Sequence, residues 1–181
     1  MGKISEMVLK LVEKNFKIFL LKNVDIMPIS FRKIIISYYP NANVRKKYFE
    51  SLGGRIGENS FFNIGFTVSP NNNLSYLHIG KNVSIAPNVI CICESNANNG
   101  DEINSYEYVK NKLTEAKEIV IEDEVWIGAN VTILPGVTIG RCTIIGAGSV
   151  VTKDLDSYSV YAGSPARKIR DIRTGEKLNV K

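Results

Sequence analysis

Residues 121–156 read IEDEVW-IGANVT-ILPGVT-IGRCTI-IGAGSV-VTKDLD, and this stretch decides the fold. An aliphatic residue stands at every sixth position, and a mostly small or β-branched residue follows it four places later. The aliphatic positions are Ile121, Ile127, Ile133, Ile139, Ile145 and Val151, and the second positions are Val125, Val131, Val137, Thr143, Ser149 and Leu155. The same phase occurs earlier as IGKNVS, IAPNVI and CICESN from Ile79, with a further start at Ile56.

A period of six matches neither an α-helix nor the alternation of a simple strand, and it is typical of a short strand followed by a turn. Three such units close a triangular coil, and successive coils stack in parallel about 4.8 Å apart. Glycine at the second position of many hexads suits a corner where a Cβ would clash or where φ is positive. The repeat therefore predicts a parallel β-helix.

Three stretches resemble the hexapeptide-repeat acyltransferase family of left-handed β-helices: IGKNVSIAPNV, VWIGANVTILPGVTIGRCTIIGAGSVVTKDL and YAGSPARKIRDI. Within it they are similar to the sugar O-acetyltransferases, which include galactoside and maltose, nodulation, xenobiotic and polysaccharide acetyltransferases. The run that they mark, from about Ile56 to Ile172, covers nearly two thirds of the chain. The resemblance implies an all-β, left-handed parallel β-helix and supplies the handedness, because this family is an exception to right-handed crossover.

The expected organisation is an N-terminal helical region at 1–50, an acyltransferase domain at 51–172 and a tail at 173–181. Two stretches leave the repeat, a polar insertion at Pro70–Leu77 and the segment 97–118. Loops of more than about 12–15 residues in a compact fold are usually functional or disordered. We therefore expect residues 97–118 to project as an arm beside the active site.

The segment Met1–Val24 has apolar residues at helical spacing, and its basic residues are Lys3, Lys10, Lys14, Lys17 and Lys22. Its uninterrupted apolar run, Ile18–Leu21, is far shorter than the about 20 residues of a membrane span, and it lacks a secretory cleavage pattern. An amphipathic helix here can pack on the protein body or contact a membrane surface. Both interpretations stay open, and the expected location is the cytoplasm, at the inner face of the membrane if that contact forms.

The three cysteines, Cys91, Cys93 and Cys142, are an odd number, which is typical of free buried thiols in a reducing compartment. Their spacing does not suit a metal pair, and a γ-type carbonic anhydrase of the same fold would need three zinc-binding histidines where this chain has one, so no metal is expected. The net charge of +5 and pI near 9.0 come without an aromatic-basic motif. They suit an anionic cofactor or a membrane surface better than nucleic acid.

The resemblance further implies a homotrimer with active sites between subunits, acetyl-CoA as co-substrate and a sugar or glycan as acceptor. The positions that match the coenzyme groove are Trp126, Ala129, Gly146, Ala147, Thr152, Lys153, Arg167, Lys168 and Arg170. Guanidinium and ammonium groups suit phosphates, although the small residues also fit as plain corner positions and the basic ones as a solvated tail. The acceptor side matches Asn63, with Phe61 beside it.

The general base of this family is a histidine after the IAPNV hexad, and this chain has Asn96 there. An amide cannot accept and release a proton at neutral pH, and losing a general base typically costs about 10²–10⁴ in rate. Four explanations stay open: an engineered change, a naturally inactive chain, a base supplied by another residue, or an alignment displaced by a few residues. The alternative bases are Glu94 and His78, which we expect one coil beneath Asn96.

The favoured function is acetyl-CoA-dependent O-acetylation of a sugar hydroxyl in a cell-surface polysaccharide or its precursor. The alternatives are N-acetylation of an amino sugar and a non-catalytic scaffold or binding protein that keeps the coenzyme groove. The acceptor itself has no recognisable motif in the sequence.

Overall fold

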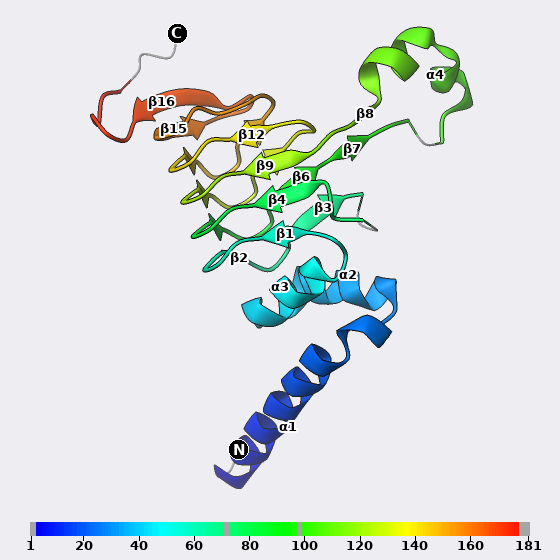
Figure 1. Ribbon diagram of the computed structural model, residues 1–181, viewed down its shortest axis with the longest axis vertical. Coiled ribbons are helices and arrows are strands. Elements are labelled where there is room, and N and C mark those ends of the chain that lie inside the picture. The colour runs from blue at the N-terminus through cyan, green and yellow to red at the C-terminus, as the bar shows by residue number, and fades with distance from the viewer. Residues whose placement is uncertain (1–2, 71–72, 98, 178–181) are drawn as a thin grey trace.

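The structure, a computed structural model, describes residues 3–70, 73–97 and 99–177, without the side chains of Lys3 and Ile4. The expected segments at 1–50, Pro70–Leu77, 97–118 and 173–181 therefore each have residues outside the described part. A helical segment leads into a stack of triangular coils, an arm projects from the stack, and an antiparallel ribbon ends it (Figure 1). The division of the chain into domains at these boundaries stays a prediction.

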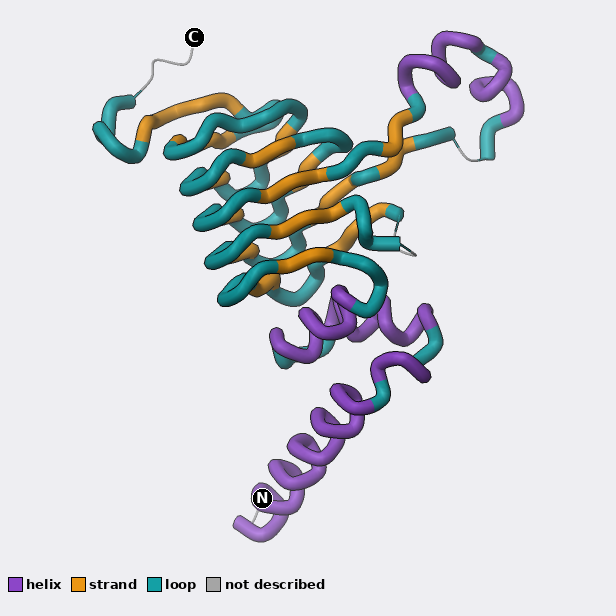
Figure 2. Tube along the Cα trace, viewed as in Figure 1, coloured by secondary structure: helices purple, strands orange, loops and turns teal. Residues whose placement is uncertain are grey.

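Three parallel sheets form the faces of a triangular prism (Figure 2). Face 1 contains β1 (Arg55–Ile56), β4 (Leu77–Ile79), β9 (Ile119–Ile121) and β12 (Thr138–Ile139). Face 2 contains β2 (Phe61–Phe62), β5 (Ser84–Ile85), β10 (Trp126–Ile127), β13 (Ile144–Ile145), β15 (Ser159–Ala162) and, antiparallel at its end, β16 (Arg167–Asp171). Face 3 contains β3 (Thr67–Ser69), β6 (Ile90–Ile92), β11 (Thr132–Ile133) and β14 (Val150–Val151). Successive coils pair 18 residues apart, as in Trp126 with Ile144 and Thr132 with Val150.

The inward positions predicted from Ile121 onward form the core of the prism, since all of them are buried, including the polar Thr143 and Ser149. The earlier hexads from Ile79 and Ile85 are buried at both positions as well. The hexad from Cys91 departs from the pattern, because Ser95 is exposed and Cys93 is buried in its place. The repeat is therefore confirmed up to Cys93 and again from Ile121.

The corner glycines are explained by the close approach of the next coil. A Cβ added to Gly128 would lie 2.6 Å from the backbone nitrogen of Ala147, although the φ of Gly128 is not left-handed. Left-handed φ occurs instead two places later in the hexad, where asparagine is common because its short polar side chain tolerates this region. The non-glycine residues with positive φ are Asn59, Asn82, Asn88, Glu124, Asn130, Cys142 and Tyr158.

Helices cover the N-terminal end of the prism: α1 (Lys3–Lys22), η1 (Val24–Ile26), α2 (Ile29–Tyr38) and α3 (Ala42–Glu50). Asn41 caps α3 by accepting from Val44 N at 3.2 Å. Phe49 of α3 packs edge-on against Phe62 of the first coil, with ring centroids 5.5 Å apart. The predicted helical region is thus present, and the prediction of an all-β chain holds only for the prism. None of the described helices is both long and apolar enough to cross a membrane.

The arm begins earlier than the sequence predicted. β7 (Glu94–Ser95) and β8 (Glu115–Ala116) pair antiparallel at its base, and α4 (Asp101–Ser105) and the π-helix η2 (Val109–Leu113) follow within it. The chain leaves the coil directly after Cys93 and returns at Ile119, which pairs with Leu77 of the coil below. The expectation that the repeat continues unbroken to Asn96 was therefore wrong.

The close stacking of the corners predicts the result of a single substitution. Gly128→Ala should lower the free energy of unfolding by about 1–3 kcal/mol, because the new methyl group would overlap the backbone of the next coil. Denaturant titration measures this loss. Gly146→Ala is the matched control and should lose less, since its nearest neighbour would be the Ala162 methyl group at 3.1 Å. Equal unfolding free energies for Gly128→Ala and the parent would contradict the stacking.

Candidate active site

The turns from face 2 to face 3 form a column that we call the small-residue edge, and it contains Asn63, Ala129, Gly146 and Ala147. Backbone hydrogen bonds join its successive turns, as from Gly146 N to Tyr161 O and from Gly148 N to Ala129 O, both 2.8 Å. Small side chains leave the backbone of this edge open to a ligand. The predicted groove residues at 129, 146 and 147 are therefore neighbours.

Two predicted aromatic residues lie on the outer surface of face 2, next to this edge. Phe61 is aligned with Ser84 and Ser84 with Trp126, so both rings belong to one row, two coils apart. They are 41% and 58% exposed, which is unusual for rings of this size in a packed coil. Lys46 Nζ lies 5.6 Å from the centroid of the Phe61 ring.

The turns from face 3 to face 1 form a second column, the arm edge, because the arm leaves from it after β6. Thr152 and Lys153 lie on the same edge and are exposed. Cys91 pairs with Ile133 on the next coil, and Ile133 pairs with Val151 on the coil after that. The arm therefore leaves two coils below Thr152, about 10 Å along the prism. The predicted coenzyme residues that lie in turns are thus divided between two edges of the prism.

Glu94 and Asn96 come together at the base of the arm, where Asn96 Nδ2 donates to Glu94 Oε1 at 2.7 Å. A hollow of about 280 Å³ opens beside them, and Ser69, Pro70, Glu94, Ser95 and Asn96 line it. A second hollow of about 290 Å³ is lined by Asn96, Ala97, Asn104, Lys110 and Thr114. The half-buried carboxylate can accept a proton, and the Asn96 amide holds one of its oxygens in place.

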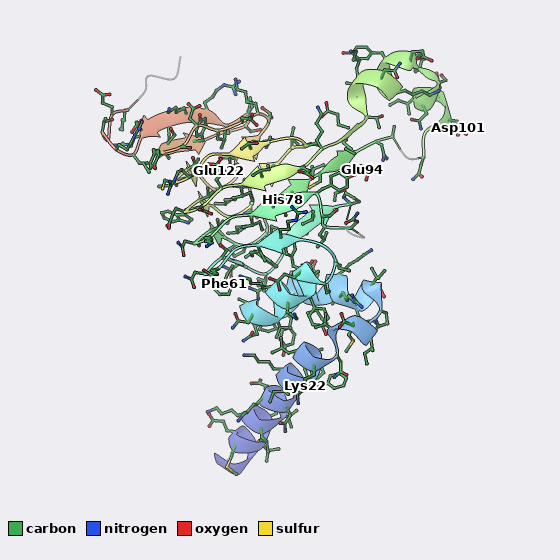
Figure 3. All side chains as sticks on the ribbon, in the orientation of Figure 1. Lys22, Phe61, His78, Glu94, Asp101 and Glu122 are labelled. Carbon is green, nitrogen blue, oxygen red and sulfur yellow. The ribbon has the colours of Figure 1, made fainter. Side chains whose placement is uncertain are left out.

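His78 does not lie beneath Asn96, contrary to the sequence-based expectation. It belongs to β4 on face 1 (Figure 3). Its neighbours on the adjacent coils are Arg55 and Val120. Its Nε2 lies 3.0 Å from Ser75 O and 3.8 Å from a Glu118 carboxylate oxygen. The expectation was wrong because the arm begins after Cys93, so Asn96 never enters face 1.

The basic residues after the last coil lie on β16, which folds back on β15. Arg167 pairs with Ala162, and Ala162 stands above Gly146 at the end of the small-residue edge. Lys168 Nζ forms an ion pair with Asp156 at 3.1 Å, and Arg170 donates to Gly175 O at 2.9 Å. Arg167 is thus the predicted phosphate ligand that adjoins the small-residue edge.

Sequence reasoning missed Ser69 and Ser95, which line the hollow beside Glu94. The repeat did not single out Ser95, because the polar Thr143 and Ser149 stand at the same inward position and are buried in the core. Among the described residues, no group of three or more His, Cys, Asp or Glu side chains is arranged to hold a metal ion.

The chain has known relatives. Residues 118–153 match the bacterial transferase hexapeptide (six repeats) family. The galactoside O-acetyltransferase of Escherichia coli K12 is 40% identical over 139 residues, which are 76% of this chain and 64% of that protein. A galactoside acetyltransferase solved in complex with coenzyme A is 31% identical, with a TM-score of 0.57 over 80% of this chain and 78% of that one. A hexapeptide-repeat acetyltransferase from Vibrio cholerae, complexed with acetyl-coenzyme A, is 27% identical, with a TM-score of 0.61 over 80% of this chain and 85% of that one.

These likenesses place the protein among the bacterial transferases built from hexapeptide repeats. The chain belongs to the hexapeptide-repeat acyltransferase family, as its sequence predicted. Its structural relatives imply that the coil winds left-handed. The chain spans about two thirds of the Escherichia coli relative.

The cysteines at the start of the arm predict a pattern of chemical labelling. Burial raises the pKa of Cys93 to about 11 and that of the fully buried Cys91 well above its usual range. At pH 8 only about one Cys93 thiol in a thousand is a thiolate. Iodoacetamide should therefore label the half-buried Cys142 first in the native protein, and all three cysteines after unfolding. Fast native labelling of Cys93, read by peptide mass spectrometry, would contradict the packing.

Proposed function

We propose that the protein is an acetyl-CoA-dependent O-acetyltransferase that acts on a sugar hydroxyl of a cell-surface polysaccharide or its precursor. The observation that carries the proposal is the small-residue edge, which ends beside the basic strand β16 and runs next to an exposed aromatic row. The galactoside acetyltransferase and the Vibrio cholerae enzyme, solved with coenzyme A and acetyl-coenzyme A, support it.

The residues at this edge suit the coenzyme chemically. Ala129 and Ala147 are small, and Gly146 has no side chain, so a narrow pantetheine-like chain can approach the backbone. Arg167 at the end of the edge offers guanidinium donors that match phosphate oxygens. Acetyl-CoA, when bound, supplies the acetyl group as an activated thioester.

Glu94 is the base in this proposal. Its carboxylate takes the hydroxyl proton as the acceptor oxygen forms its bond to the acetyl carbon, the carbon–sulfur bond breaks, and the proton passes to the departing sulfur. Asn96 donates to Glu94 and orients it. Asn63 and Phe61 contact the acceptor. A carboxylate is a weaker base than the imidazole that the family has at position 96, so we expect slow turnover.

We propose a homotrimer with composite sites, and the separation of the two edges supports it. Glu94 and Lys153 belong to the arm edge, whereas Ala147 belongs to the small-residue edge and Arg167 adjoins it. No residue of the small-residue edge lines the two hollows at the arm. One copy can bring its arm edge to the small-residue edge of the next, and a cyclic arrangement repeats this contact. We propose a cytoplasmic location, because three free cysteines fit a reducing compartment.

The absence of histidine at position 96 favours one alternative, an amine acceptor such as an amino sugar. A neutral amine has a free lone pair and can lose its proton after attack, so it depends less on a strong base than a hydroxyl does. A scaffold that binds the coenzyme without transfer is the remaining alternative.

The choice of base can be tested at two neighbouring positions. Glu94→Gln should lower the rate of thiol release with a galactoside, maltose or glucosamine acceptor by about 10²–10⁴ and leave acetyl-CoA affinity unchanged. Asn96→His should raise the rate with the hydroxyl acceptors, because it adds a base with a pKa near 7. A thiol-trapping dye measures the rate and calorimetry measures the affinity.

His78→Gln is the matched control and should leave the rate unchanged. Release by Asn96→His alone would exclude Glu94 as a sufficient base. Release by the parent chain with glucosamine only would favour the amine acceptor. If the parent and Asn96→His both bind acetyl-CoA but neither releases thiol, a scaffold is favoured. If neither binds acetyl-CoA, the proposal is overturned.

The composite site predicts complementation. Ala147→Trp should fill the exposed small-residue edge, and Glu94→Gln should remove the base, so each variant alone is inactive. Copies unfolded together and refolded as mixed trimers should regain about a quarter of the parent activity, since that fraction of sites has two intact edges. Mixtures of separately folded variants are the control. No recovery in the refolded mixture would place both edges of a site on one chain.

A further inference from the structure

We propose that α1 is a docking element for an anionic membrane surface, a role separate from acetyl transfer. The helix extends away from the prism at the end opposite to the C-terminal ribbon (Figure 1). It is anchored near its C-terminal end, where Leu20 is buried and Tyr48 Oη donates to Leu20 O at 3.0 Å.

The apolar side of α1 is large and uncovered. Eight apolar side chains along it are between 40% and 65% exposed: Met7, Val8, Leu9, Leu11, Val12, Phe16, Ile18 and Phe19. At 100° per residue they span an arc of about 200°, within which Ser5, Asn15 and Lys22 also lie. An exposed apolar surface of this extent marks an interaction site.

On the opposite arc, of about 100°, α1 has Glu6, Lys10, Glu13, Lys14 and Lys17, whereas Lys22 falls within the apolar arc. Part of this arc faces the protein body, since Lys10, Glu13, Lys14 and Lys17 line a hollow together with Phe16, Tyr39, Pro40 and Asn41. The body therefore lies on the charged side and against Phe16, whose ring centroid is 6.4 Å from that of Tyr39, and it leaves the rest of the apolar arc exposed.

The charge of the whole chain lies at this end. Residues 1–50 contain ten Lys and Arg and four Asp and Glu, and residues 51–181 contain thirteen and fourteen, so the formal charges are +6 and −1. Anionic lipid headgroups complement such a region, and an amphipathic helix with lysines on its polar side and Phe or Leu on the other is typical of interfacial binding. Long lysine side chains reach headgroups from the side of the helix.

A second copy of the chain fits this surface less well. A helix-to-helix seam uses about two positions in seven, much less than the apolar arc here. Each copy of α1 also has five Lys and two Glu, so copies brought together repel one another. We therefore propose that α1 docks on a lipid surface, and self-association is one outcome of the test.

The test is sedimentation of the full chain with vesicles of phosphatidylcholine, with or without phosphatidylglycerol. The parent should bind the anionic vesicles more tightly and lose binding as salt is raised. Val8→Asp/Val12→Asp should weaken binding to both vesicles by roughly 100-fold, because it places charge in the apolar arc. Lys10→Gln/Lys14→Gln/Lys17→Gln should weaken binding to anionic vesicles by roughly 100-fold, at about fivefold per lysine, and leave neutral vesicles unaffected.

Ile103→Asp/Leu113→Asp is the matched control, since it adds the same charge at two exposed apolar positions of the arm and should bind as the parent does. Circular dichroism establishes that each variant is folded. Failure of the parent to bind either vesicle would overturn the proposal. So would an unchanged vesicle affinity of Val8→Asp/Val12→Asp together with a smaller oligomer in sedimentation velocity, which would assign α1 to self-association.

Discussion

The close stacking of one coil on the next is the constraint on which the rest of the structure depends. Backbone hydrogen bonds hold successive turns together, and at the corners the backbones approach so closely that a single methyl group on Gly57 or Gly128 would overlap the neighbouring coil. Because the stacking is in register, residues 18 apart form straight columns along the prism. Residues that are far apart in sequence, such as Ala129 and Gly148, therefore meet on one edge.

The same register explains how the coil accommodates long insertions. The chain leaves after Cys93 and returns so that Leu77 pairs with Ile119 and His78 with Val120, as though the intervening residues were absent. In a solenoid each coil contacts only its neighbours, so a loop that leaves and returns at one edge does not disturb the ladder. The arm is thus free to place Glu94 and Asn96 beside the stack while the core stays continuous.

The prism was predictable because its signal is local and repeated. Each hexad contains its own inward-pointing residues, and Ile127, Ile133 and Val151 are buried as expected. The start of the arm was not predictable in this way. Cys91 and Cys93 alternate as a strand does, and nothing local marks where the strand turns from face 3 into the antiparallel ribbon. The wrong placement of His78 followed from that one boundary, because register across an insertion depends on where the chain returns.

The two ends of the prism carry different chemistry for a related reason. A stack of coils exposes unpaired backbone and apolar side chains at each end, so both ends need a cap. At one end Phe49 and the rest of α3 close the core, and at the other β16 pairs with β15. The hexad pattern does not limit the sequence of either cap. Arg167 thereby reaches the small-residue edge, and α1 holds its apolar surface and lysines clear of the stack.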